Sequence, residues 1–257
     1  MTGNLIEVAI VTLLGLAIGS FLNVVIHRLP KRESLVSPGS RCPACGYALG
    51  AADNVPVLSY VLLGGRCRRC RTRISVRYPI VELVTAAIFL AHYYVFGWTP
   101  LLAVRLLFAS SLVALFAIDL EHHLLPDAIT LPGIVAGLLT SLVLPPGIRD
   151  ALIGVLAGGG VLWLIGEAYY RYAGEEGMGG GDVKMLAMIG AFLGWQLVIV
   201  TLVFSSIAGA VIGMLVIAVK RGGMKYALPY GTFLSIAAFV ASLYGEQIVR
   251  WYTGLYR

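Results

Sequence analysis

Long runs of apolar residues constrain the fold of this chain more than any other feature. Hydrophobic residues make up 59% of its 257 residues and charged residues only 12%, whereas a soluble domain has about a quarter charged residues. Several runs reach the roughly 18 residues that predict a membrane-spanning helix. We therefore predict an all-α polytopic membrane protein of about eight transmembrane segments, at residues 5–26, 79–97, 100–118, 126–144, 149–170, 182–193, 196–219 and 228–247.

The sixth segment, 182–193, is too short to cross a hydrocarbon core of about 30 Å at about 1.5 Å per residue. It is expected to be tilted or partly inserted. Alternatively, residues 182–219 form one broken helix, which gives seven spans. Seven spans would place the basic cluster from Lys220 to Lys225 outside, so we favour eight.

The basic residues predict the orientation in the membrane. Ten of the 19 Lys and Arg lie between Arg28 and Arg77, in one loop between apolar segments. The positive-inside rule makes this loop cytoplasmic, which explains the charge without nucleic acid as a partner. No Lys or Arg precedes the first run, so it is a retained span with its N-terminus outside rather than a cleaved signal. Counting onward places 119–126, 171–182 and 220–227 on the cytoplasmic side.

All four cysteines lie in this basic loop, in two C-x-x-C pairs separated by 21 residues. Each pair lets two thiolates converge on one tetrahedral cation, and two pairs complete a closed site. Gly46 supplies the backbone freedom that such a turn needs, and the neighbouring arginines offset the charge of four thiolates. Thioredoxin-type redox chemistry needs a single pair on a βαβ scaffold. We therefore predict a small cytoplasmic loop domain with a structural zinc bound by Cys42, Cys45, Cys67 and Cys70.

Two carboxylates stand where apolar segments meet the predicted cytoplasmic interface. Asp119 ends one run, and Asp182 follows the glycines Gly179, Gly180 and Gly181 and opens another. An ionisable group at this depth is a functional candidate. Two close carboxylates share a proton, so that one activates water while the other polarises a carbonyl. The glycines would let a substrate backbone lie close to Asp182 and would permit positive φ.

Other interpretations of these residues stay open at this point. Asp182 and Asp127 could each cap a helix, and Glu121, His122 and His123 could form a solvated turn. A carboxylate-based transporter with a zinc-stabilised loop, or a membrane scaffold, would also use such a chain. The chain has no H-E-x-x-H and no G-x-S-x-G, so the usual zinc and serine protease motifs are missing.

Six motifs in order resemble those of bacterial type IV prepilin peptidases, which are leader peptidases and N-methyltransferases. The resemblance runs nearly end to end, and it includes the two C-x-x-C pairs. Its other motifs span Gly19 to Pro30, Arg77 to Glu82, Asp119 to Asp127, Gly177 to Lys184 and Leu228 to Gly231.

In that family the G-x-G-D aspartate and an earlier aspartate at the end of a span form the catalytic pair. These match Asp182 and Asp119, with Asp127 as the reserve candidate. The resemblance implies that the chain cleaves the basic leader of a prepilin or pseudopilin after a glycine. It also implies S-adenosylmethionine-dependent N-methylation of the new N-terminus, usually Phe, for which spacing assigns no residue.

The resemblance further implies a bacterial inner membrane location, with lipid around the spans and the active site facing the cytoplasm. The expected domains are a first transmembrane helix (1–27), a cytoplasmic basic loop with the Cys₄ zinc site (28–78) and a transmembrane peptidase core (79–257). Acidic Glu33, Glu82, Glu121, Glu175 and Glu176 are candidates to attract the basic leader.

Overall fold

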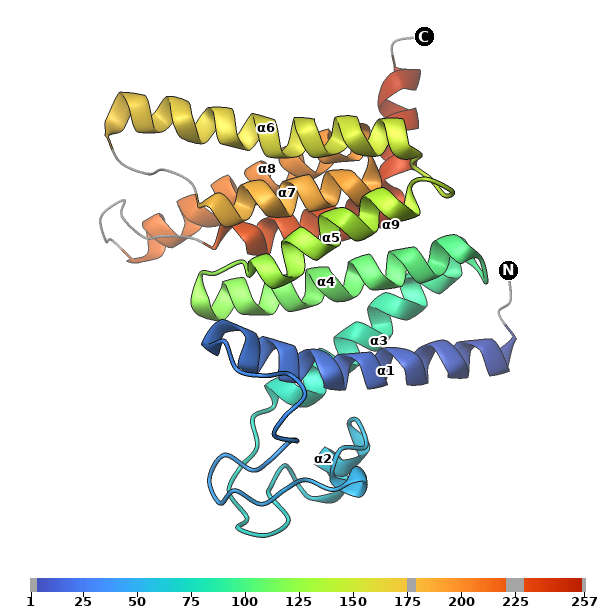
Figure 1. The fold of residues 1–257 in the computed structure, drawn as a ribbon, viewed down its shortest axis with the longest axis vertical. Helices are drawn as coiled ribbons and strands as arrows, with labels where there is room; N and C mark the ends of the chain where they lie inside the picture. The colour runs from blue at the N-terminus through green and yellow to red at the C-terminus, as the bar shows by residue number, and fades with distance from the viewer. Residues whose placement is uncertain (1–3, 175–178, 221–228, 256–257) are drawn as a thin grey trace. The chain divides into compact units, whose positions relative to one another are not determined.

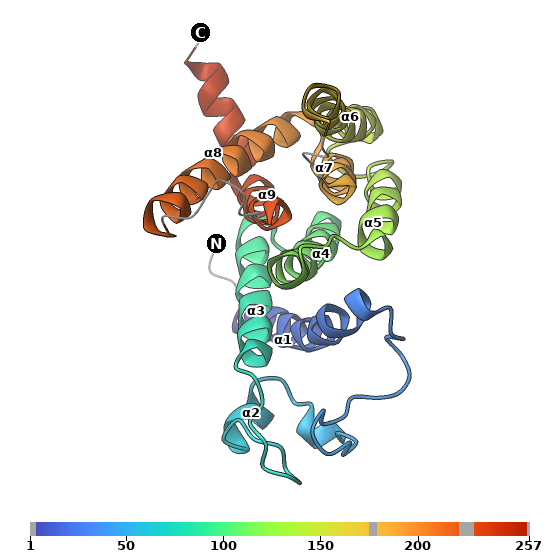
Figure 2. The same cartoon turned by 90° about the vertical axis from the view of Figure 1, so that its left-hand side faces the viewer.

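The computed structural model describes residues 4–174, 179–220 and 229–255. Long helices dominate this part of the chain (Figures 1 and 2), and it contains two isolated β-bridges but no β-strand. The chain divides into two compact units, Met1–Leu102 and Ala103–Arg257. The predicted all-α fold is confirmed.

The first unit is a pair of helices with a loop between them. Helix α1 (Leu5–Arg28) packs against α3 (Arg77–Phe96). A Cβ added at Gly15 would lie 2.6 Å from Ala86 Cα, and one at Gly19 would lie 2.6 Å from Glu82 Cα. The two glycines form a G-x-x-x-G pattern, which lets two helix backbones approach closely. The loop carries two short 3₁₀ turns, Leu29–Lys31 and Ala51–Asp53, and the short helix α2 (Leu58–Leu62).

The second unit contains the last 20 residues of α4 and five further helices. Helix α7 lies among α5, α6, α8 and α9 and packs against each of them (Figure 2), and every residue from Met185 to Leu193 is buried. The helix bounds are Pro100–His122 for α4, Asp127–Thr140 for α5, Ile148–Ala173 for α6, Gly180–Leu193 for α7, Trp195–Lys220 for α8 and Tyr230–Gly254 for α9.

Glycines bring α5 and α6 close to this central helix. A Cβ at Gly154 of α6 would lie 2.5 Å from the Gly190 carbonyl oxygen, and one at Gly158 would lie 2.5 Å from the Leu186 carbonyl oxygen. On α5, a Cβ at Gly137 would lie 2.7 Å from the Ala191 Cβ. Tight helix contacts of this kind replace the hydrophobic driving force that lipid does not provide. They fix α7, and with it the helix start that carries Asp182.

The number of spans differs from the prediction. The eight segments are all helical, but only six of the described helices are long and apolar enough to cross a membrane: α1, α3, α4, α6, α8 and α9. Helices α5 and α7 have 14 residues each, which is about 21 Å at about 1.5 Å per residue. The alternative of one broken helix over 182–219 is also wrong, because α8 runs back in the direction opposite to α7 (Figure 1). Gly194, at φ 81°, separates α7 from α8.

The helix directions bring the predicted site to one end of the second unit. Helices α4, α6 and α8 end where α5, α7 and α9 begin, on the left in Figure 1. Asp119 near the end of α4 and Asp182 near the start of α7 therefore share that end. Six long apolar helices make this a multi-pass membrane protein.

The close packing of α6 and α7 gives a stability prediction. Gly154→Ala should destabilise the protein by about 1–3 kcal/mol, because the new methyl group overlaps the α7 backbone and neither helix can withdraw. Gly160→Ala is the matched control, since a Cβ at this position on the same helix meets no atom within 4 Å. Thermal unfolding in detergent should show a lower midpoint for the first variant only. Equal midpoints would contradict the packing described.

Candidate active site and metal site

Asp119 lies in the last turn of α4 and is only 5% exposed. Its Oδ2 accepts a 2.8 Å hydrogen bond from the Thr232 backbone N–H and a 3.1 Å bond from the Thr232 hydroxyl. Thr232 is the third residue of α9, where backbone N–H groups have no acceptor within their own helix. Asp119 therefore caps the start of α9 from another helix, and the partial positive charge there favours its carboxylate.

Asp182 occupies the third position of α7 and is half-buried. Its backbone N–H donates to the Gly179 carbonyl at 3.1 Å, which closes the first turn of the helix. Gly179 precedes the helix and has no side chain to cap it. Gly181, the residue before Asp182, and Gly231, which lies beside the Asp119 carboxylate, both pack against Leu125. The structure thus brings together the two aspartates that the sequence singles out.

Leu125 is the contact that joins the helix ends around these carboxylates. It is 8% exposed and lies in the turn between α4 and α5. A Cβ added at Gly181 would lie 2.9 Å from its Cβ, and one at Gly231 would lie 2.9 Å from its methyl groups and 3.0 Å from Asp119 Oδ2. The start of α7, the start of α9 and the end of α4 therefore meet around one buried side chain.

The glycines before Asp182 do not use the positive φ that they permit. Gly179 has φ −70°, and positive φ occurs at none of Gly179, Gly180 and Gly181. Gly181 is needed for the close contact with Leu125, whereas a Cβ at Gly180 would meet no atom within 4 Å. Of the three, Gly180 therefore has the most open surroundings. Gly177, which begins the motif, lies outside the described residues.

The turn after Asp119 is exposed and sharply bent. Glu121, His122 and His123 are all exposed, which agrees with a solvated turn. His123 has φ 51°, a left-handed conformation that ends helices, and its backbone N–H donates to the Asp119 carbonyl at 2.9 Å.

Asp127, the reserve candidate, forms an ion pair with Lys184. The Lys184 Nζ lies 2.7 and 2.8 Å from the two carboxylate oxygens, and Asp127 is 55% exposed. Asp127 is not the N-cap that the alternative interpretation made it, because Pro126 is the N-cap and α5 begins at Asp127 itself. The pair links the starts of α5 and α7.

Thr232 and Lys184 are site residues whose roles sequence reasoning missed. Both lie within or next to one of the six family motifs. Thr232 directly follows the Leu228–Gly231 stretch, and Lys184 ends the Gly177–Lys184 stretch. Position in a motif marks a residue, but only the fold shows that Thr232 binds Asp119.

The four cysteines form a separate cluster in the loop of the first unit. Their Sγ atoms all lie within 4.8 Å of one another, with Cys42 to Cys70 at 3.7 Å and Cys45 to Cys67 at 4.0 Å. A tetrahedral metal with bonds of about 2.3 Å places its sulfur ligands about 3.8 Å apart. The cluster therefore has the size of a four-thiolate metal site.

The two C-x-x-C turns have the same backbone pattern. Cys42 N–H donates to the Tyr47 carbonyl, and Cys67 N–H donates to the Thr72 carbonyl, both at 2.9 Å. The residue after the second cysteine has positive φ in each turn, 70° at Gly46 and 58° at Arg71. The backbone freedom expected of Gly46 is confirmed, while the second turn places arginine in the same left-handed conformation.

Hydrogen bonds favour thiolate at two of the cysteines. The Thr72 hydroxyl and backbone lower the pKa of Cys70 to about 6, and the backbone N–H groups of Ala44 and Cys45 lower the pKa of Cys42. Although the Tyr47 N–H opposes it, burial together with the neighbouring thiols raises the pKa of Cys45 to about 11. Four sulfurs this close can all be thiolates only around a cation.

Two carboxylates outside the cluster hold this loop in place. The Arg68 guanidinium lies 2.6 Å from Asp53, and this hydrogen bond lowers the pKa of Asp53. Glu82, 7% exposed, accepts a 2.7 Å hydrogen bond from the Val57 N–H. Glu82 is therefore not an exposed attractor for a basic leader, contrary to the prediction. Glu175 and Glu176 lie outside the described residues.

Comparisons with known proteins cover both units. Residues 13–96 match the bacterial peptidase A24 N-terminal domain, and residues 106–214 match the type IV leader peptidase family. A relative from Aeromonas salmonicida is 42% identical over 274 residues, covering 95% of this chain and 93% of its own. The chain belongs to the type IV leader peptidase family. The predicted family membership is confirmed.

Further relatives give the same result for this leader peptidase family member. One from Pseudomonas aeruginosa is 39% identical over 93% of this chain and 91% of its own. One from Burkholderia pseudomallei is 38% identical over 93% of this chain and 86% of its own. All three are named prepilin leader peptidase/N-methyltransferase. These names support the peptidase interpretation and not the transporter. No solved structure shows significant similarity to the chain.

The left-handed residues of the two cysteine turns give a prediction for metal retention. Gly46→Ala should weaken metal binding by about 1 kcal/mol, because alanine is strained at φ 70°, whereas Arg71→Gly should retain the metal at least as well as wild type. Competition with a coloured chelator would measure both. Faster metal loss from Arg71→Gly than from Gly46→Ala would contradict these backbone conformations.

Proposed function

We propose that the chain is an aspartic endopeptidase whose catalytic pair is Asp119 and Asp182. The observation that carries the proposal is the meeting of three helix ends around Leu125, which places both carboxylates in one partly buried region. Asp127 is a poor substitute because it is exposed and paired with Lys184. The glycines Gly179, Gly180 and Gly181 are proposed to leave room for the substrate backbone, with Gly180 the most open.

The hydrogen bonds suggest which carboxylate holds the shared proton. Two donors from Thr232 stabilise the charged form of Asp119, so the proton resides on Asp182. Asp119 then takes a proton from a water molecule as the water oxygen attacks the scissile carbonyl carbon, and Asp182 donates its proton to the carbonyl oxygen. In the breakdown of the intermediate, Asp119 gives the proton it took to the amide nitrogen, and the C–N bond breaks to release an amine. Asp182 takes a proton back from a hydroxyl of the intermediate as the new carboxyl group forms, so the pair again holds one shared proton.

The proposed substrate is a prepilin or pseudopilin, cut after a glycine between its basic leader and its apolar helix. We place the active site at the cytoplasmic face of a bacterial inner membrane, with the N-terminus outside. The basic loop 28–78 supports this orientation through the positive-inside rule. Exposed Glu33 and Glu121 remain candidates to attract the leader.

We further propose that the four cysteines bind a structural zinc. Four thiolates leave no open position for a reacting water, so the metal would order the loop 28–78 between the first helix (1–27) and the peptidase core (79–257). S-adenosylmethionine is the proposed co-substrate that supplies a methyl group to the amine released by cleavage.

The catalytic pair is tested with a purified prepilin. Asp119→Asn and Asp182→Asn should each lower the cleavage rate by about 10³-fold or more, because neither variant can share and transfer the proton. Asp127→Asn is the control and should cleave within about 3-fold of wild type, since exposed ion pairs contribute about 0–1 kcal/mol. Gel analysis of the leader and the mature pilin measures all three. Normal cleavage by either of the first two variants would show that the pair is wrong.

Zinc binding is tested by metal analysis. Cys42→Ser or Cys67→Ser should remove about one equivalent of zinc per chain, because three thiolates bind the ion less tightly than four. Ser40→Ala, in the same loop, is the control and should keep the metal. A Cys₄ zinc site would be refuted if the purified wild-type protein contained no zinc. It would also be refuted if the cysteine variants kept a full equivalent of zinc.

Methylation is tested in the same cleavage reaction with S-adenosylmethionine labelled in its methyl group. Label should appear on the N-terminus of the mature pilin and not on uncleaved prepilin, because the amine exists only after cleavage. A cleaved but unlabelled product would reject the second activity while leaving the peptidase intact.

A further inference from the structure

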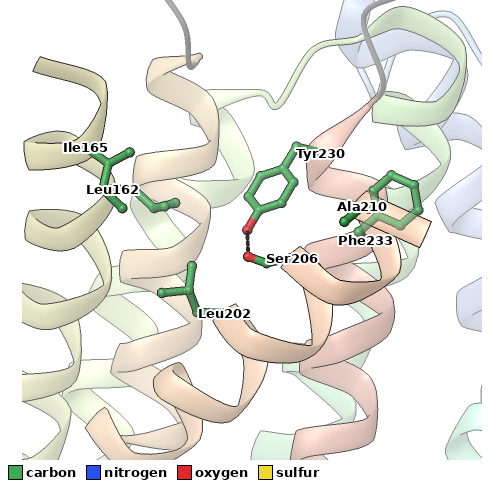
Figure 3. Close-up of a pocket in the computed structure, with 8 residues that line it drawn as sticks. Leu162, Ile165, Leu202, Ser206, Ala210, Tyr230 and Phe233 are labelled. Carbon is green, nitrogen blue, oxygen red and sulfur yellow. Dashed lines mark hydrogen bonds between the residues drawn. The ribbon is translucent and has the colours of Figure 1, made fainter. Parts of the chain in front are cut away.

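A cavity of about 430 Å³ lies between α6, α8 and α9 (Figure 3). Its walls are almost entirely apolar. Leu162 and Ile165 line it from α6, Leu202 and Ala210 from α8, and Phe233 from α9. All three helices are candidate membrane spans, and Ile165 and Ala210 are exposed. The cavity therefore opens sideways on an apolar surface.

The only polar groups that Figure 3 shows in the cavity are the hydroxyls of Tyr230 and Ser206, which lie 3.3 Å apart. Tyr230 also contacts buried Ser205 at 3.1 Å. These contacts hold the tyrosine ring against α8. A mostly apolar hollow with a few fixed polar groups is typical of a binding site for a specific side chain or ligand.

The first turn of α9 links the cavity wall to Asp119. Tyr230, which lines it, begins α9 and is followed by Gly231 and then by Thr232, whose N–H and hydroxyl bind Asp119. On the opposite wall, Leu162 lies one turn beyond Gly158, which packs on α7 at Leu186. The next residue, Gly159, lies level with Val183, beside Asp182. One edge of the cavity, at Tyr230, therefore lies at the helix end that carries both aspartates.

We propose that this cavity binds the apolar residues that directly follow the scissile bond of the substrate, with the first side chain after the cut held between Leu202, Tyr230 and Phe233. The assignment rests on the proposed peptidase function. A basic leader would be poorly solvated among these walls, whereas an apolar segment carries no charge to desolvate there. Because the cavity opens sideways, a helix already in the bilayer can enter it without leaving the lipid.

The kinetic test compares two substitutions on α8. Ala210→Phe fills the cavity, while Ile212→Phe adds an aromatic ring about 200° away around the helix axis, at about 100° per residue. The first variant should lower kcat/KM by about 10-fold for a prepilin with Phe after the cut, and much less for one with Ala there. The second should treat both substrates as wild type does. The proposal would be overturned if both variants lowered kcat/KM equally. It would also be overturned if Ala210→Phe lowered kcat/KM equally for the Phe and Ala substrates.

A binding test separates this inference from the proposed catalytic pair. A prepilin carrying a photoreactive benzoyl group on the first residue after the cut would be cross-linked to the full-length protein in lipid vesicles. Mass spectrometry should locate the attachment on Leu162, Leu202 or Tyr230, even in Asp119→Asn protein, because binding needs no cleavage. Attachment elsewhere on the chain, or only to lipid, would show that the cavity does not bind this residue. That conclusion would hold whether or not the two aspartates are catalytic. Normal cleavage by Asp119→Asn would reject the pair alone.

Discussion

The cap that Asp119 places on α9 is the interaction on which the candidate site depends. A carboxylate only 5% exposed is costly to keep charged in a membrane protein. Here it accepts two hydrogen bonds from Thr232, at 2.8 and 3.1 Å, at a helix start that attracts negative charge. The same contact ties the end of α4 to the start of α9. Because Gly231 has no side chain, Leu125 can fill the space beside this contact and reach Gly181 at the start of α7.

The rest of the second unit holds this convergence in place. Helix α7 is short, buried and packed against glycines of α5 and α6, so its start cannot move without disturbing the centre of the unit. Arg105 of α4 donates a 3.2 Å hydrogen bond to the Phe192 carbonyl near the other end of α7, where a cation is favoured by the helix dipole. Both ends of the central helix are thus bound to α4. The apolar cavity lined by Tyr230, proposed as a substrate site, borders this unit's first turn of α9.

Much of the fold and of the candidate site could be predicted from the sequence, because the length of the apolar segments and the order of the motifs carry strong signals. The eight segments are all helical, and the pairing of the C-x-x-C motifs follows from their spacing. The span count could not be predicted as well, since α5 and α7 are apolar like the others but too short to cross. Neither could the cap that Asp119 makes on α9 through Thr232, because it joins residues 113 positions apart. The choice of Asp119 over Asp127 came from resemblance, and the ion pair with Lys184 supports it on separate, physical grounds.

The central claim is that Asp119 and Asp182 work as one catalytic unit, and a double-mutant cycle tests it most directly. Prepilin cleavage would be measured for wild type, Asp119→Ala, Asp182→Ala and the double variant. If the two carboxylates share one proton and one water, the double variant should be no slower than the slower single variant, within about 3-fold. Losses that multiply, so that the double variant is slower by the product of the two single effects, would show that the aspartates act independently and would contradict the account.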